Sequence, residues 1–143
     1  MCSRSRRFSP RPRNKGQVTS DKRMPEQPRD LVKRTFDFAL NVRRFVDQLP
    51  KSISNCEDSK QLVRSSGSVA ANYLEAQEGL SRKDFFYRIK VCRKEARESG
   101  LWLRLLSAGS DPTVTAEKDR LATEAEELTR IFSSIAGKDD TGE

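Results

Sequence analysis

Basic side chains recur at a fixed interval in the second half of this sequence. They lie seven residues apart, with one more between the second and the third, and we call them the basic stripe: Lys83, Lys90, Lys94, Arg97 and Arg104. A seven-residue interval places side chains along one flank of a helix, where cations could follow the phosphates of RNA or DNA. The alternative is a solvated flank, or ion pairs with acidic helices of the same or a neighbouring subunit.

Motifs for enzymatic chemistry are scarce. The sequence has no histidine, which is the commonest general base and metal ligand. It also has no phosphate-binding glycine loop, no Gly-x-Ser-x-Gly and no Glu-x-x-His pair for a di-iron site. Glu75, Glu95 and Glu98 could form an acid–base or metal cluster, but on helices this charged such carboxylates more often serve in ion pairs. We therefore expect no enzyme, no cofactor and no metal site.

The cysteines and the hydropathy favour a cytoplasmic protein. Cys2, Cys56 and Cys92 are scattered, without a Cys-x-x-Cys pair, which suits a reducing compartment. Cys92 falls on an apolar helix seam, so we predict a small buried side chain there. No run approaches the roughly 18 apolar residues of a membrane helix, and the basic amino terminus lacks the apolar stretch of a secretory signal.

The net charge of +7 is confined to the amino-terminal segment. Residues 1–23 alone carry a net charge of +7, and the other 120 residues carry 20 side chains of each sign. Arg, Pro and Ser dominate residues 1–28, so we predict a disordered arm that attracts phosphate. Its first arginines join the candidate nucleic-acid-binding residues: Arg4, Arg6, Arg7, Arg11 and Arg13. The alternative is that translation starts at Met24 and the arm is not made.

The basic stripe belongs to a helix predicted over Ser81–Leu106. Small and apolar residues alternate there by four and three positions: Phe85, Ile89, Cys92, Ala96, Ser99, Leu103 and Leu106. This spacing predicts a helix packed lengthwise against a neighbour. Ser81 is placed to cap the helix, and Asp84 lies near the positive end of its dipole. Trp102 lies one position from the seam, which favours the core or a subunit interface over a base-stacking platform.

Three further helices complete an all-α, antiparallel up-down-up-down four-helix bundle predicted over residues 29–137. The first spans Asp30–Leu49 before Pro50, and its inward residues are expected at one helical face: Val32, Phe36, Ala39, Val42, Val46 and Leu49. The last spans Thr115–Ile135 and stops at Gly137, leaving residues 138–143 as a frayed tail. Its inward residues are Leu121, Ala125, Leu128, Phe132 and Ile135.

The second helix is predicted over Glu57–Glu78 and has an unusual middle. Its expected inward residues are Leu62, Val63, Ser66, Val69, Ala70, Tyr73, Leu74 and Gln77. Serines and Gly67 are unfavourable in a helix interior, where a glycine costs about 1 kcal/mol relative to alanine. Such small residues are tolerated where another helix comes close, so we predict a tight crossing. Asn72 is the expected buried polar group that fixes the register of the helices.

Three ordered motifs resemble one known family. They are Ser66-x-Ser68-x-Ala70-Ala71-Asn72-Tyr73-x-Glu75-Ala76, then Ser81-Arg82-Lys83-Asp84-Phe85, then Lys94-Glu95-Ala96-x-Glu98-Ser99 with Trp102-Leu103. This combination, within Leu31–Ala136, is similar to the four-helix-bundle proteins of 23S ribosomal RNA intervening sequences, also called S23. The resemblance implies a short antiparallel bundle that assembles as a ring-shaped homopentamer in bacteria. It supplies no catalytic residue. From their types and positions we expect packing or oligomer contacts for Asn72, Glu75, Glu95, Glu98 and Trp102.

A relative of that family, the accessory variability determinant of diversity-generating retroelements, is a basic pentameric barrel that binds nucleic acid and works with a reverse transcriptase. The present bundle differs from it in being neutral. We therefore expect a non-enzymatic, cytoplasmic homo-oligomer that binds RNA or DNA electrostatically. The alternative is a structural or protein-interaction module that binds no nucleic acid. Neither interpretation involves a membrane.

Overall fold

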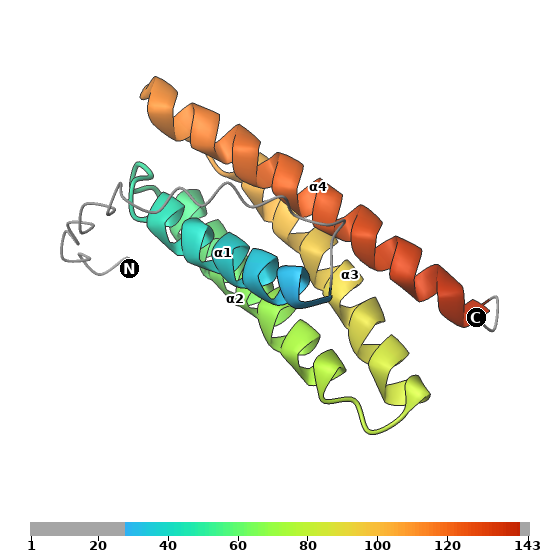
Figure 1. The fold of residues 1–143 in the computed structure, drawn as a ribbon. Coiled ribbons are helices and arrows are strands. Elements are labelled where there is room, and N and C mark those ends of the chain that lie inside the picture. Colours follow the sequence, from blue (N-terminus) through green and yellow to red (C-terminus); the bar gives the residue numbers. More distant parts are fainter. Residues whose placement is uncertain (1–27, 141–143) are drawn as a thin grey trace, which may run out of the picture.

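The computed structural model describes residues 28–140, which form four helices and, within that range, no strand. They are α1 (Pro28–Val46), α2 (Ile53–Gln77), α3 (Arg82–Leu105) and α4 (Pro112–Asp140). Figure 1 shows consecutive helices running in opposite directions, so the predicted antiparallel four-helix bundle is confirmed. The arm was predicted over residues 1–28; residues 1–27, with its arginines, lie outside the described residues, and Pro28 is the first residue of α1. No described helix is long and apolar enough to cross a membrane.

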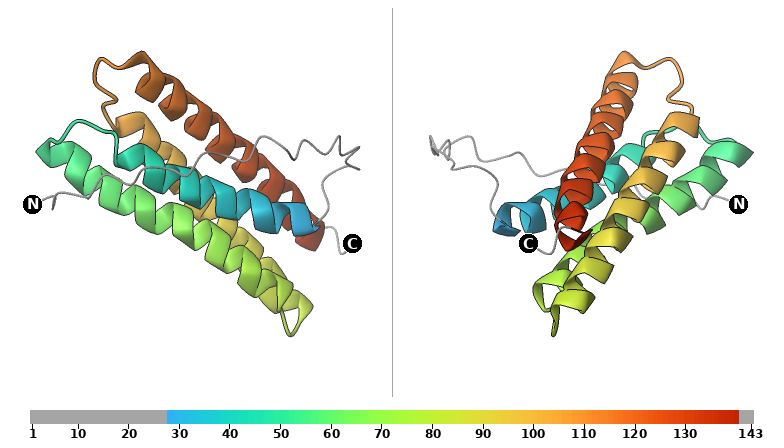
Figure 2. Two further views of the ribbon diagram at one scale, coloured as in Figure 1. Left: turned by 60° about the vertical axis from the view of Figure 1, so that its left-hand side comes forward. Right: turned by 90° about the vertical axis from the view of Figure 1, so that its right-hand side faces the viewer.

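The four helices do not pack equally. α3 packs along both α2 and α4, whereas α1 packs mainly against α2 and makes few contacts with α4 (Figure 2). A groove of about 1250 Å³ therefore runs between α1 and α4, with Phe38, Phe45 and Leu121 in its lining. Arg34 of α1 spans it through ion pairs of 2.6 Å to Glu124 and to Glu127 of α4. Ion pairs at the rim of this groove thus add to the buried apolar core that α1 and α4 share.

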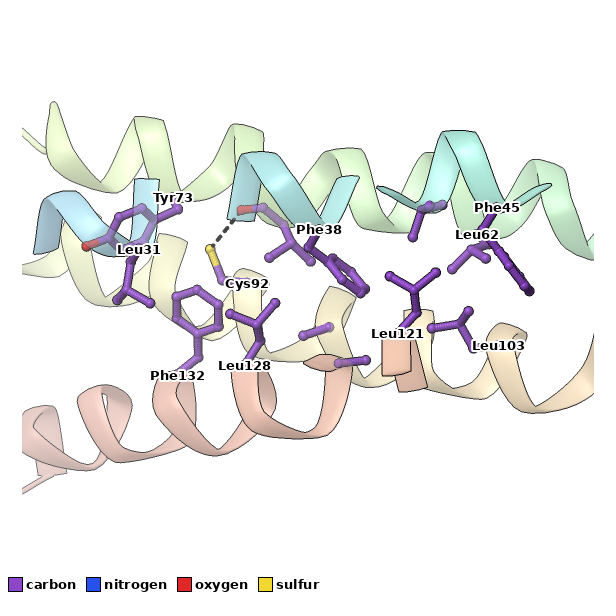
Figure 3. Close-up of a cluster of buried hydrophobic side chains, with 14 of the residues drawn as sticks. Leu31, Phe38, Phe45, Leu62, Tyr73, Cys92, Leu103, Leu121, Leu128 and Phe132 are labelled. Atoms are coloured by element: carbon purple, nitrogen blue, oxygen red, sulfur yellow. Dashed lines mark hydrogen bonds between the residues drawn. The ribbon is translucent and has the colours of Figure 1, made fainter. Parts of the chain in front are cut away.

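The predicted seam of α3 is confirmed. Its positions from Ile89 to Leu106 are buried, and Phe85 at the first turn is half-buried. Ser81 caps the helix, because its Oγ accepts a hydrogen bond of 3.1 Å from the Asp84 backbone N–H. In Figure 3 the seam meets side chains from the other helices, and Cys92 Sγ donates to the carbonyl oxygen of Val69 at 3.5 Å.

The predicted inward face of α1 is wrong at Phe36, which is 60% exposed, whereas Phe38 is 1% exposed. Apolar residues occupy several faces of α1, so periodicity alone allowed two neighbouring stripes. Thr35 lies on the buried stripe, and its hydroxyl is satisfied there because it donates to the Leu31 carbonyl at 2.7 Å. The helix also ends at Val46, three residues before the predicted end, and a turn leads to Pro50.

The ends of α2 and α4 differ from the prediction. α2 begins at Ile53, because Ser52 Oγ accepts from the Asn55 N–H at 3.1 Å and so caps the helix one turn earlier. Asp111 similarly caps α4, accepting from the Thr113 N–H at 2.9 Å. α4 continues through Gly137 to Asp140, so the frayed tail does not begin at residue 138. A glycine ends a helix only when it adopts the left-handed conformation, and Gly137 does not.

The small residues of α2 do mark close crossings. Gly67 leaves room for the guanidinium group of Arg43 of α1, since a Cβ there would lie 3.0 Å from Arg43 Nη2. On the other side of α2, the buried hydroxyls of Ser65 and Ser99 are 2.8 Å apart. Two predicted inward residues of this helix are wrong, since Leu74 is 53% exposed and Gln77 is also exposed.

Candidate nucleic-acid interface

The basic stripe lies on the outer flank of α3 nearest to α4. Lys83, Lys94, Arg97 and Arg104 are exposed, and none of them forms an ion pair with another described residue. Lys90 is the exception, with its Nζ 2.9 Å from Asp139 Oδ2 of α4. α3 carries eight basic and three acidic side chains, and these four basic ones are exposed without an ion pair to a described residue.

A shallow cavity of about 270 Å³ adjoins the stripe between α3 and α4. Arg97 and Arg104 line one wall, and Glu126 and Arg130 belong to the other. The floor is made by small residues, since a Cβ at Gly100 would lie 3.7 Å from the Cβ of Ala125. Two guanidinium groups beside a shallow, open hollow can approach an extended polyanion without desolvation of a buried charge.

The opposite flank of α3 carries an ion-pair cluster with α2. Arg64 Nη2 lies 2.5 Å from Glu98 Oε1, and Arg64 Nη1 lies 3.4 Å from Glu95 Oε2. Trp102 Nε1 donates to Glu98 Oε1 at 3.2 Å. Glu95 is 7% exposed and its Oε2 is buried with no hydrogen bond among the described residues, so only the charge of Arg64 compensates it. Glu75, predicted with them, is exposed on α2.

The pKa values of this cluster follow from its contacts. Partial burial disfavours the Glu98 carboxylate, but hydrogen bonds from Trp102 and Arg64 outweigh it, so the pKa of Glu98 is lowered. The hydrogen bond to Glu98 in turn raises the pKa of Arg64. Both groups are therefore held in their charged forms, which is the state of a structural ion pair. Within residues 28–140 no group of three His, Cys, Asp or Glu side chains could hold a metal ion.

Cys92 and Tyr73 are buried in the core and are not placed for chemistry. Burial raises the pKa of the Cys92 thiol to about 12, and burial also raises the pKa of Tyr73 to about 12. Both groups stay protonated at neutral pH. The prediction of a small buried side chain at Cys92 is confirmed.

Asn72 is half-buried, so the prediction of a buried side chain is wrong, whereas its role in the register of the helices stays a prediction. Its Nδ2 donates to the Ser68 carbonyl at 2.8 Å, and its Oδ1 accepts from Arg88 Nη1 at 3.0 Å. Asn72 thus joins α2 to α3 at the surface. Trp102 is half-buried on α3, as its position beside the seam suggests.

A buried polar group that links two connections of the bundle is Asn55, which precedes the predicted start of the second helix at Glu57. Asn55 is 4% exposed and its Nδ2 donates to the carbonyls of Pro50 and Ser107, each at 2.9 Å. Its Oδ1 accepts from the Ser107 N–H at 3.0 Å. These bonds tie the α1–α2 turn to the α3–α4 loop, which lie at the same end of the bundle (Figure 2). The only sequence signal was a polar residue shortly after Pro50.

Comparisons with known proteins agree with this geometry. A crystal structure described as a protein with unknown function from the S23 ribosomal protein family of Bacteroides thetaiotaomicron matches with a TM-score of 0.64 and 24% identity, over 77% of this chain and 97% of that chain. At this identity the match shows a shared fold. A search of curated proteins found no match. The model of the family described as 23S rRNA-intervening sequence protein matches residues 28–134, so the chain belongs to the family of 23S rRNA-intervening sequence proteins.

Proposed function

We propose that this protein is a non-enzymatic, cytoplasmic homo-oligomer that binds RNA or DNA through the basic stripe. The observation that carries the proposal is the set of four exposed cations on one flank of α3 without an ion-pair partner among the described residues: Lys83, Lys94, Arg97 and Arg104. Cations already used in structural pairs gain little from a phosphate, whereas these four can each replace a condensed counterion.

The binding mode is electrostatic. The stripe follows one flank of a 24-residue helix, which rises about 1.5 Å per residue, so it is long enough to meet several successive phosphates. Its long flexible side chains contact the backbone of a nucleic acid and do not read base edges. Affinity should therefore be weakly dependent on sequence and strongly dependent on salt.

Self-association would multiply this surface. The resemblance described above implies a ring of five subunits, and a ring brings the stripe of every subunit into one assembly. Light scattering would then give the mass of one ring, which is five times the chain mass of 16.3 kDa, or of two rings where rings associate. A monomeric mass at every concentration tested would refute self-association. A relationship to the accessory variability determinant of diversity-generating retroelements is also part of this proposal.

A second candidate is a structural or protein-interaction module that binds no nucleic acid. The ion pair between Lys90 and Asp139 favours it, because it shows one cation of the stripe already held by an acidic side chain of α4. In that case Arg97 and Arg104 would pair with carboxylates of a neighbouring subunit.

The two candidates differ in what charge removal does. We would measure binding of fluorescent single- and double-stranded RNA and DNA to the full chain by anisotropy. The test variant carries K83Q, K94Q, R97Q and R104Q, and the control loses equal charge away from α3 through K33Q, R44Q, K60Q and R120Q. We expect the test variant to bind at least tenfold more weakly than the control. Equal affinities would assign binding to another surface, and no binding at low salt would favour the second candidate.

A further inference from the structure

α3 carries a second seam on the side that faces away from the bundle core. The residues on it again alternate by four and three positions: Tyr87, Val91, Lys94, Glu98, Leu101 and Leu105. Three of these are large apolar side chains exposed to solvent, at 61% for Tyr87, 42% for Leu101 and 57% for Leu105. We call this set the outer seam. Single exposed apolar residues are ordinary, but a row at this spacing is typical of a helix with a partner.

The outer seam is complementary to itself. In an antiparallel pair of helices the numbers of facing residues add to a constant. In the outer seam the residue numbers add to 192 in three pairs: Tyr87 with Leu105, Val91 with Leu101, and Lys94 with Glu98. An antiparallel pair centred near residue 96 therefore places apolar side chains opposite apolar ones at both ends. At the centre it places each Lys94 opposite a Glu98.

We infer that the outer seam packs against the same seam of a second copy of this chain, across a twofold axis. Such an axis makes the contact isologous, so each facing pair occurs twice. This inference depends on the proposed self-association, and it adds which helix makes the contact and how it is oriented. A fivefold ring has no twofold axis of this kind. In such a ring the contact would join two rings.

The contact has a consequence for the basic stripe. A twofold axis perpendicular to two antiparallel helices keeps the same flank of each helix on the same face of the pair. The stripes of both copies therefore lie side by side, with Arg97 near the Arg97 of the second copy. Lys94 faces Glu98 within the contact and no longer contributes, so the surface offered to a polyanion consists of Lys83, Arg97 and Arg104 from both copies. It also adds repulsion between the copies, which salt screens over about 8 Å at 0.15 M.

A pair of substitutions at the two ends of the seam tests the orientation. Tyr87→Glu and Leu105→Lys each place a charge opposite an apolar side chain of the second copy, so each should weaken the contact. Both residues are exposed, so neither change disturbs the core. The double variant Y87E/L105K keeps the net charge of the chain. In each of the two symmetry-related pairs, the introduced carboxylate of one copy then faces the introduced ammonium group of the other. Leu80→Lys is the control, since Leu80 is 96% exposed and lies outside the seam.

The measurement is the mass of the assembly by light scattering over a concentration series, in about 0.3 M salt so that the repulsion is screened. We expect each single variant to halve the mass relative to the unmodified chain and to Leu80→Lys, and the double variant to restore it. An oligomer whose mass no seam variant changes would overturn this inference and leave self-association intact. A double variant as small as the single ones would overturn the antiparallel register. A monomeric unmodified chain would overturn both this inference and the proposed self-association.

Discussion

Replacement of Asn55 by alanine tests whether this buried amide holds the loop end of the bundle. The substitution removes three hydrogen bonds and leaves the carbonyls of Pro50 and Ser107 and the N–H of Ser107 without their partner. Each lost bond of this kind costs about 1 kcal/mol, so we expect a loss of about 3 kcal/mol. For a domain of this size that lowers the Tm by about 12 °C.

Asn72→Ala is the matched control, because the residue type and the helix are the same. Asn72 is half-buried, and water can replace it at the Ser68 carbonyl and at Arg88. We expect this change to cost about 1 kcal/mol or less. Urea denaturation followed by circular dichroism gives both free energies of unfolding. If Asn55→Ala costs no more than Asn72→Ala, the bridging role of Asn55 is wrong.

Three further predictions concern stability. Cys92 and Tyr73 have pKa values of about 12 in the folded chain, against ordinary values of 9.0 and 10.0. Between pH 9 and 12 the folded state therefore keeps protons that the unfolded state loses, so the Tm in thermal melts should fall as the pH rises. In Cys92→Ala the fall should start at a higher pH, because only Tyr73 remains. Arg64→Ala leaves the buried Glu95 carboxylate without its cation, so the free energy of unfolding from urea denaturation should fall by about 2 kcal/mol. Adding Glu95→Gln should restore more than half of that loss. A double variant as unstable as Arg64→Ala would contradict this role of Arg64. Gly109→Ala should cost about 2 kcal/mol, because Gly109 has φ of 74° and a Cβ there would lie 2.7 Å from Pro50 Cγ; an unchanged Tm would contradict that.

The sequence predicted the buried seam of α3 well because its small and apolar residues keep the four-and-three spacing over three heptads. Every seam position from Ile89 to Leu106 is buried, and Ser81 is the observed cap. α1 was harder because Phe36 and Phe38 offer competing apolar stripes, and only packing against the other helices shows which one enters the core. Local periodicity cannot show that packing.

Polar contacts between residues far apart in the chain were also not predicted from the sequence. Asn55 reads as a loop residue in the sequence, because its partner Ser107 is 52 positions away. The candidate site was easier, since a seven-residue interval of cations needs only helical geometry to form a stripe. The ion pair of Lys90 with Asp139 was not predictable, because it requires α4 to extend past Gly137.

The salt dependence of nucleic-acid binding tests the central claim most directly. Each phosphate contact to a single strand contributes about 0.7 to the slope of log K against log salt concentration. The variant with K83Q, K94Q, R97Q and R104Q should therefore show a slope smaller by about 2 to 3 than that of the full chain with its stripe intact, when both bind the same single-stranded RNA. An identical slope would show that the basic stripe does not contact phosphate and would contradict the proposed function.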